Sequence, residues 1–308
     1  MKKYSNLVIV ILSFIILILI LMSKGLVSKT IITSFGIWFN TLVPSMFPML
    51  ILSDILINYN FVQYIPKRIV NFISKIFNIS SSAVLIVFLS MVSGFPANAI
   101  NIYNAYDKKA ISKEEAEHIL LFNHFANPLF ILQTVGIFYL NNNKYGVIIL
   151  ISHILANIII GIIFRKRNHY SLSNYISKNG KSQNFGNVLS NAIKKTINSL
   201  LMVSGTVTLF LVLSTLIINT FRLNNYLAVF VQGILEMTMS IATLSTLSIS
   251  DTFKVVIATM IISFGGLSIH MQVISSLEDK IKYRNYFIGR LYQMFISGII
   301  AFVIMTII

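Results

Sequence analysis

Residues 90–128 read SMVSGFPANAINIYNAYDKKAISKEEAEHILLFNHFANP, and they break an otherwise apolar sequence twice. The first break is Ser93-Gly94-Phe95-Pro96, and the second is Asn127-Pro128. Lipid cannot satisfy the N–H and C=O groups that a broken helix leaves free, so such backbone must be surrounded by protein or line a polar cavity. Because Asn and Ser residues flank both breaks, we expect them to face a cavity that holds a ligand.

The composition predicts a polytopic membrane protein. Hydrophobic residues make up 56% of the chain and charged residues 11%, whereas charged residues make up about 25% of a soluble domain. The chain has no Cys, so it has neither a disulfide framework nor a thiolate metal site. The net charge of +15 comes from basic residues in short loops between apolar runs. This pattern is typical of anchoring to the cytoplasmic face, and we expect no nucleic-acid partner.

The apolar runs divide the chain into two halves of the same order: span, re-entrant hairpin, broken helix, span. In the first half these are residues 31–58, 80–106, 113–140 and 145–164, and in the second half residues 196–218, 226–249, 253–277 and 284–308. A hairpin is expected at 80–106 because its apolar arm is too short to cross a bilayer, which takes about 20 residues. Three crossings per half would turn the second half upside down, and inverted repeats with broken helices are typical of secondary transporters.

The predicted fold class is therefore an all-α polytopic membrane protein with an inverted repeat and one extra N-terminal transmembrane helix. Its predicted parts are an N-terminal transmembrane helix (1–30), a first repeat (31–164), a basic cytoplasmic linker (165–195) and a second repeat (196–308). We expect the first helix to be retained, because no small-residue cleavage site follows it. An N-terminus inside the cell places most Lys and Arg in inside loops at 60–78, 107–113, 165–195 and 278–290.

Local signals refine these segments. Residues 60–78 have the pattern of an amphipathic helix that lies in the membrane interface. A capping box at Ser112 predicts a helix start near Lys113, and this helix should run to about Leu140 with an interruption at Pro128. Asp251 is a predicted N-cap for the 253–277 segment.

Glu236 is the most informative polar residue, because an acid in an apolar run is costly and usually faces a pathway or a partner. It would accept hydrogen bonds from a solute or bind a coupling cation or proton; the alternative is a structural hydrogen bond. The break at Pro128 should free the carbonyl of His124, and Asn123 and Asn127 should share a helical face. His270 is either a proton carrier or anion partner, or a neutral His bonded to a backbone carbonyl.

The predicted substrate-binding residues lie at the two hairpin tips and the two helix breaks. They are Ser93, Gly94, Phe95, Pro96, Asn98, Asn123, Asn127, Gly233, Glu236, Thr238, Gly265, Gly266, Ser268, His270 and Gln272. The chain lacks the phosphate-binding, dinucleotide-binding, nucleophile-elbow and zinc-protease motifs. We therefore expect no enzyme activity, no catalytic residues, no metal site and no cofactor, apart from Na⁺ or H⁺ as a coupling ion whose identity is open.

Four motifs carry a resemblance to a known family. The segments MVSGFPANA, SKEEAEHILLFNHFANPLF, QGILEMT and FGGLSIHMQV occur in this order between about residue 36 and the C-terminus. Together they resemble the sporulation integral membrane proteins of the YlbJ type, which have a nucleoside recognition or gate domain. The family's first tip often reads SGYP-SGA, and here Phe95 and Ala97-Asn98 differ from it. The layout is also distantly similar to concentrative nucleoside transporters, but their first-tip Gln-Thr-Glu is absent.

The resemblance implies a role in endospore formation, with dipicolinate moved from the mother cell toward the spore across the membrane around the forespore. A dianionic aromatic acid would suit helix N-termini and Asn and Ser donors. Glu236 fits beside a dianion only if it is protonated or pairs with a cation. We therefore expect a secondary transporter of a small polar or aromatic solute in the cell membrane. The alternatives are a non-transporting membrane scaffold or sensor, and a nucleoside transporter. The expected partners are the solute and the lipid bilayer, and a homo-oligomer is left open.

Overall fold

The computed structural model describes residues 2–59, 61–165 and 184–308, and every regular element in these ranges is a helix. Five helices there are long and apolar enough to cross a membrane, or up to six if one bent pair counts as a span. They are Lys24–Asn58, Asn143–Ile163 (α8), Phe185–Phe221 (α9), Asp251–Ser276 and Arg284–Ile307 (α14). The prediction that the chain is an all-α protein with several candidate membrane spans is confirmed.

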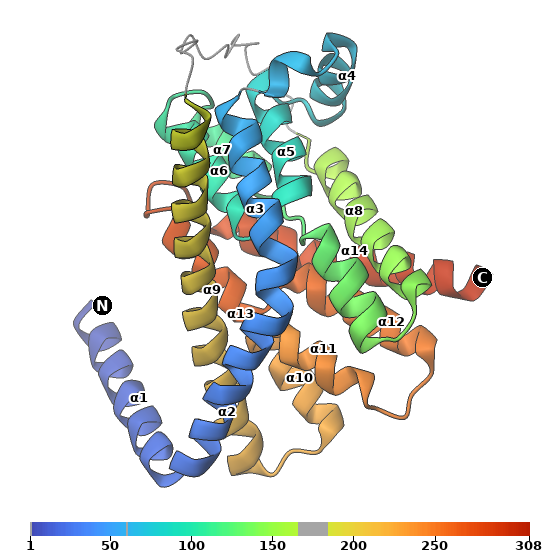
Figure 1. Cartoon of the computed structure of the whole chain (residues 1–308). Coiled ribbons are helices and arrows are strands. Elements are labelled where there is room, and N and C mark those ends of the chain that lie inside the picture. Colours follow the sequence, from blue (N-terminus) through green and yellow to red (C-terminus); the bar gives the residue numbers. More distant parts are fainter. Residues whose placement is uncertain (1, 60, 166–183) are drawn as a thin grey trace.

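The first span is built from α2 (Lys24–Ile37), a π-helical turn (Trp38–Leu42) and α3 (Val43–Asn58), which contains Pro48. The N-terminal helix α1 (Lys2–Met22) lies outside the bundle and diverges from α2, which it meets at its C-terminal end (Figure 1). Its apolar part is shorter than a full span, so its crossing of the membrane stays a prediction.

Helix α4 (Lys67–Phe77) meets α5 (Ser81–Ser93) at 95°. It buries Val70 and Phe77 and exposes Phe72, as an amphipathic helix should. The predicted amphipathic segment is thus helical, but the α-helix begins only at Lys67, after a short 3₁₀ turn at Phe61–Tyr64.

Two helical hairpins form where the sequence predicts them. The first hairpin is α5 with α6 (Ala97–Asp107), and the second is α10 (Asn225–Leu235) with α11 (Met237–Ser245). In Figure 1 the first hairpin lies in the upper part of the bundle and the second in the lower part. At about 1.5 Å per residue, each of these helices is much shorter than the roughly 30 Å apolar thickness of a bilayer.

Two broken segments accompany the hairpins. Helix α7 (Lys113–Ile119) ends far earlier than expected, and residues 120–127, the first break, are not helical before a π-helix at Phe130–Tyr139. Pro128 does not interrupt a helix; it follows the break and starts the next helical turn, where its missing N–H costs nothing. The predicted helix from 113 to about 140 does break, but the break begins at residue 120 and ends at Pro128, whereas the interruption was expected at Pro128 itself. The second break is Gly265, between α12 (Asp251–Phe264) and α13 (Gly266–Ser276), as predicted.

The helix starts confirm one local prediction and correct two others. Ser112 caps α7 as expected, because its Oγ accepts the N–H of Glu115. Asp251 is not an N-cap: Ser250 takes that role, and Asp251 instead accepts the hydroxyl of Tyr145 at 2.7 Å. The linker does not reach residue 195, since α9 begins at Phe185; its central part, residues 166–183, lies outside the described residues.

Candidate solute site at the hairpin tips and helix breaks

The tip of the first hairpin packs directly on the first break. Gly94 has φ +73°, and a Cβ built on it would lie 2.5 Å from the backbone nitrogen of Asn127. Only a glycine permits this approach of two backbones. Phe95 of the same tip stacks on the ring of His124, with 4.8 Å between the centroids. The predicted break at the first hairpin tip and the predicted break before Pro128 therefore pack directly on each other.

The second half repeats this pairing with other residues. Gly266 has φ +71°, and a Cβ on it would lie 3.2 Å from the backbone nitrogen of Met237, beside Glu236 at the second tip. The two breaks also meet each other, because a Cβ on Gly265 would lie 3.5 Å from Nε2 of His124. The first tip and both breaks thus meet at the His124 ring, and the second tip packs on the second break beside it.

The predicted first-half residues hold the first break in place. Asn98 donates to the carbonyl of Phe125 at 3.1 Å, and Asn123 donates to the hydroxyl of Ser90 at 2.8 Å. Asn127 accepts the N–H groups of Leu129 and Phe130 and so caps the helical segment that follows. These Asn side chains connect the hairpin to the break, rather than sharing one helical face as expected.

Glu236 also has a structural role. Its Oε1 accepts the N–H of Thr238 at 3.0 Å, and its Oε2 accepts the N–H of Met239 at 2.9 Å, which caps α11. The carboxyl group is almost fully buried at the second tip. Gly233 lies nearby, with Ser240 and Ile261 around it. The alternative of a structural hydrogen bond is therefore present, and a binding role for Glu236 stays a prediction.

The predicted residues of α13 point to different neighbours. Gln272 donates to Thr206 on α9 at 2.6 Å. The Nε2 of His270 bonds the carbonyl of Phe264, and its Nδ1 bonds the hydroxyl of Tyr283. His270 thus holds the C-terminal end of α12, which is the second arrangement considered for it. The Oγ of Ser268 is buried with no hydrogen-bond partner among the described residues.

The carbonyl of His124 is not free, contrary to the prediction. It accepts the side-chain amide of Asn157 at 2.6 Å and that of Gln293 at 3.4 Å. His153, on α8, lies beside it and also bonds the broken backbone. Its Nε2 accepts the N–H of Ala126 at 3.0 Å, and its Nδ1 bonds the Oγ of Ser263 at 2.9 Å. The broken backbone is therefore satisfied by side chains from α8 and α14.

Sequence reasoning missed the central residues of α14. Arg290 was assigned to an inside loop at 278–290, but it is fully buried within the last candidate span. Its Nη2 donates to the carbonyl of Leu121 in the first break at 3.1 Å. Tyr286 bonds Nδ1 of His124 at 2.9 Å. The available signal was one Arg inside the run YFIGRLYQMF, where a charge is as unusual as Glu236 in its own run.

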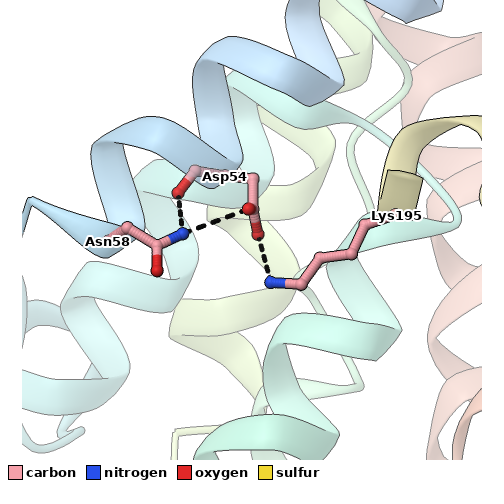
Figure 2. A network of polar contacts seen from close by, with 3 residues as sticks. All are labelled: Asp54, Asn58 and Lys195. Carbon is pink, nitrogen blue, oxygen red and sulfur yellow. Dashed lines mark hydrogen bonds and ion pairs between the residues drawn. The ribbon is translucent and has the colours of Figure 1, made fainter. Parts of the chain in front are cut away.

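Ion pairs lie away from this site. Asp54 on α3 pairs with Lys195 on α9 at 2.9 Å and accepts the amide of Asn58 at 3.1 Å (Figure 2). At the end of the first hairpin, Tyr103 donates to Glu278 in the loop after α13. This hydrogen bond, together with Lys280, lowers the pKa of the Glu278 carboxyl. These contacts join the two halves at the periphery and bring no charge to the tips.

The spans, hairpins and broken segments define a helical integral membrane protein whose buried polar residues converge at helix breaks. The sporulation integral membrane protein YlbJ of Bacillus subtilis (strain 168) is 26% identical to the chain over 299 residues, covering 85% of this chain and 73% of that protein. The chain is a distant homologue of this sporulation protein, which confirms the resemblance in its motifs. No family model matches the chain, and no solved structure does.

Proposed function

We propose that the chain is a secondary transporter that binds a small polar or aromatic solute between its hairpin tips and helix breaks. One observation carries the proposal: each hairpin tip lies against the break of its own half, and the two breaks meet at His124. Irregular backbone at membrane depth is typical of solute and ion sites in such transporters. The sequence contains no phosphate-binding, dinucleotide-binding, nucleophile-elbow or zinc-protease motif, which favours transport over an enzyme.

The arrangement of the halves supports alternating access. The first hairpin and the second lie toward opposite ends of the bundle in Figure 1, as an inverted repeat requires. In this proposal the repeats run from 31 to 164 and from 196 to 308, and the N-terminus is inside. Rocking of one repeat against the other would expose the site to each side in turn.

The proposed solute is dipicolinate, and the proposed setting is the membrane around the forespore. Support comes from the homologous protein, which is named for sporulation, and from the resemblance in the four motifs. The coupling ion is Na⁺ or H⁺, with Glu236 as the group that would bind it or the solute.

Uptake of labelled dipicolinate into proteoliposomes tests the proposal, with nucleosides as comparison solutes and with imposed Na⁺ or H⁺ gradients. We expect uptake by the wild type and its loss in Glu236→Gln. Because Glu236 also caps α11, each variant must first elute as a folded species. The exposed Asp279→Asn is the matched control and should transport normally. Absence of uptake of any solute by folded wild-type protein would favour a scaffold or sensor.

A further inference from the structure

Arg290 is a buried cation without a counter-ion. Its side chain is fully buried. All nine Asp and Glu residues of the chain lie in the described ranges, and none forms an ion pair with Arg290. A guanidinium stays protonated in proteins, so it cannot avoid the cost of burial by becoming neutral. An unpaired buried charge of this kind usually marks a functional site in a membrane protein.

The contacts that Arg290 does make are neutral. Its Nη2 donates to the carbonyl of Leu121, and its guanidinium lies 5.2 Å from the ring centroid of Tyr286. The Nε and Nη1 atoms are buried and have no acceptor among the described residues. These two atoms carry three of the five N–H donors of an arginine. The unpaired Oε1 of Gln293 is a neutral amide oxygen, which does not balance the charge.

A second unpaired donor belongs to the same cluster. The rings of His124 and His270 both lie edge-on to Tyr286, at 5.3 and 5.2 Å between centroids. We assign the Tyr286 hydroxyl as the donor to Nδ1 of His124, because the reverse leaves two buried groups unpaired instead of one. This assignment places the ring proton on Nε2, which has no acceptor among the described residues and lies beside the Gly265 break.

We propose that Arg290, with the Nε2–H of His124, binds a carboxylate of the solute at the first break. A carboxylate has only acceptor oxygens and matches a guanidinium in both charge and shape. The inference rests on the proposed function, and it specifies which residues bind the anionic solute: the main binding group is Arg290 rather than Glu236. Glu236 is not needed to bind the anion in this arrangement, and its oxygens accept the N–H groups of Thr238 and Met239 at the start of α11.

Direct binding to the wild type is the first test. The purified full chain in nanodiscs of neutral lipid is titrated calorimetrically with pyridine-2,6-dicarboxylate, with benzoate and with neutral pyridine-2,6-dicarboxamide. We expect the carboxylates to bind at least about tenfold more tightly than the carboxamide, since charge-assisted hydrogen bonds are the stronger ones. Equal affinity for the dicarboxylate and the carboxamide, or binding of neither carboxylate, overturns the proposal.

Variants then test whether Arg290 supplies the positive charge that binds the carboxylate. Arg290→Gln should weaken carboxylate binding about a hundredfold, and Arg290→Lys should retain an intermediate affinity, because it keeps the charge but loses the planar fork. Arg284→Gln is the matched control: it removes an exposed arginine from the same helix and should leave the affinity unchanged. Wild-type affinity in folded Arg290→Gln contradicts the proposal. If Arg290→Gln does not fold, the affinity of Arg290→Lys for the carboxylates and the comparison with the carboxamide still test the proposal.

Uptake measured on the same preparations separates this inference from the transport proposal. Carboxylate binding that depends on Arg290 but is accompanied by no uptake would refute transport and leave the anion site standing. Uptake that proceeds at the wild-type rate in Arg290→Gln would refute the anion site and leave transport standing.

Discussion

The tip of the first hairpin carries no charged side chain, whereas the tip of the second hairpin carries Glu236. Helix α6 begins at the first tip without a side-chain cap, and Gly94 there lies against the backbone of Asn127. Helix α11 begins at the second tip with both oxygens of Glu236 on its first N–H groups. The first tip thus lacks an acidic cap and depends on close backbone packing, whereas the second tip combines such packing, at Gly266, with the Glu236 cap.

The largest expected effect comes from Gly94→Ala. The new Cβ would meet the backbone of Asn127 at 2.5 Å, and φ is +73°. Backbone atoms cannot move aside cheaply, and the φ of +73° with ψ of −177° is a conformation that essentially only glycine adopts, which alone costs an alanine about 1–3 kcal/mol. We expect a total loss of roughly 3 kcal/mol or more of unfolding free energy, which is large for one substitution. Thermal unfolding of the purified protein followed by size-exclusion chromatography measures it.

Gly266→Ala is the counterpart in the second half and should cost less, since its Cβ would lie 3.2 Å from the nearest backbone atom. Gly205→Ala, a helical position with nothing within 4 Å, is the control and should be neutral or slightly stabilising. Equal stability of Gly94→Ala and Gly205→Ala would show that backbone packing does not hold the first tip.

Removal of the acidic cap is the next largest effect. Glu236→Ala leaves the buried N–H of Thr238 and the partly buried N–H of Met239 without an acceptor, which should cost about 2 kcal/mol. Glu236→Gln keeps one good acceptor oxygen and should cost about half as much. Chemical unfolding monitored by circular dichroism compares the two. If Glu236→Ala were as stable as the wild type, the carboxylate would not be a cap, and its burial would need another explanation.

Substitutions of Asn127 at the first break should lower the unfolding free energy by less, and they separate the cap from the contact to the hairpin. Asn127→Ala removes the cap for Leu129 and Phe130 and should cost about 1–2 kcal/mol. Asn127→Ser keeps a capping oxygen and loses only the long contact to the Ser93 carbonyl at 3.4 Å, so it should cost less than half of that. The same unfolding assay applies. An equal loss in both variants would mean that the contact to the hairpin, not the cap, is what matters.

The sequence predicted the features whose causes are local. Gly94, Glu236 and Gly265 each interrupt an apolar run, and each proved to be a tip or a break. The start of the first break was not predictable in this way, because residues 120–127 read LLFNHFAN and contain neither Gly nor Pro. Their backbone leaves the helix because partners elsewhere satisfy it: Arg290 bonds the carbonyl of Leu121, and Asn157 bonds that of His124.

The candidate site was predicted less completely than the fold. The ring of His124, where the two breaks meet, was not among the predicted site residues, although it lies in one of the four motifs. Arg290 was placed in a loop because the charged stretch before α14 and the first turns of that helix form one basic segment in the sequence. Only the packing of α14 against the first break shows that this charge is buried, since Gly289 allows the carbonyl of Leu121 to approach.

The ion pair between Asp54 and Lys195 (Figure 2) provides the smallest expected effect and a control for the comparison of the tips. It joins α3 of the first half to α9 of the second half, away from both tips, and the Lys195 side chain is 64% exposed. Exposed pairs contribute about 0–1 kcal/mol, so Asp54→Asn and Lys195→Gln should each change stability by less than that amount. A double-mutant cycle at low and high salt measures the coupling, which should decrease as salt screens the charges. A coupling of several kcal/mol that salt does not weaken would show that the halves are fastened together at their periphery. The tips and breaks would then no longer be the main contacts that order the two halves.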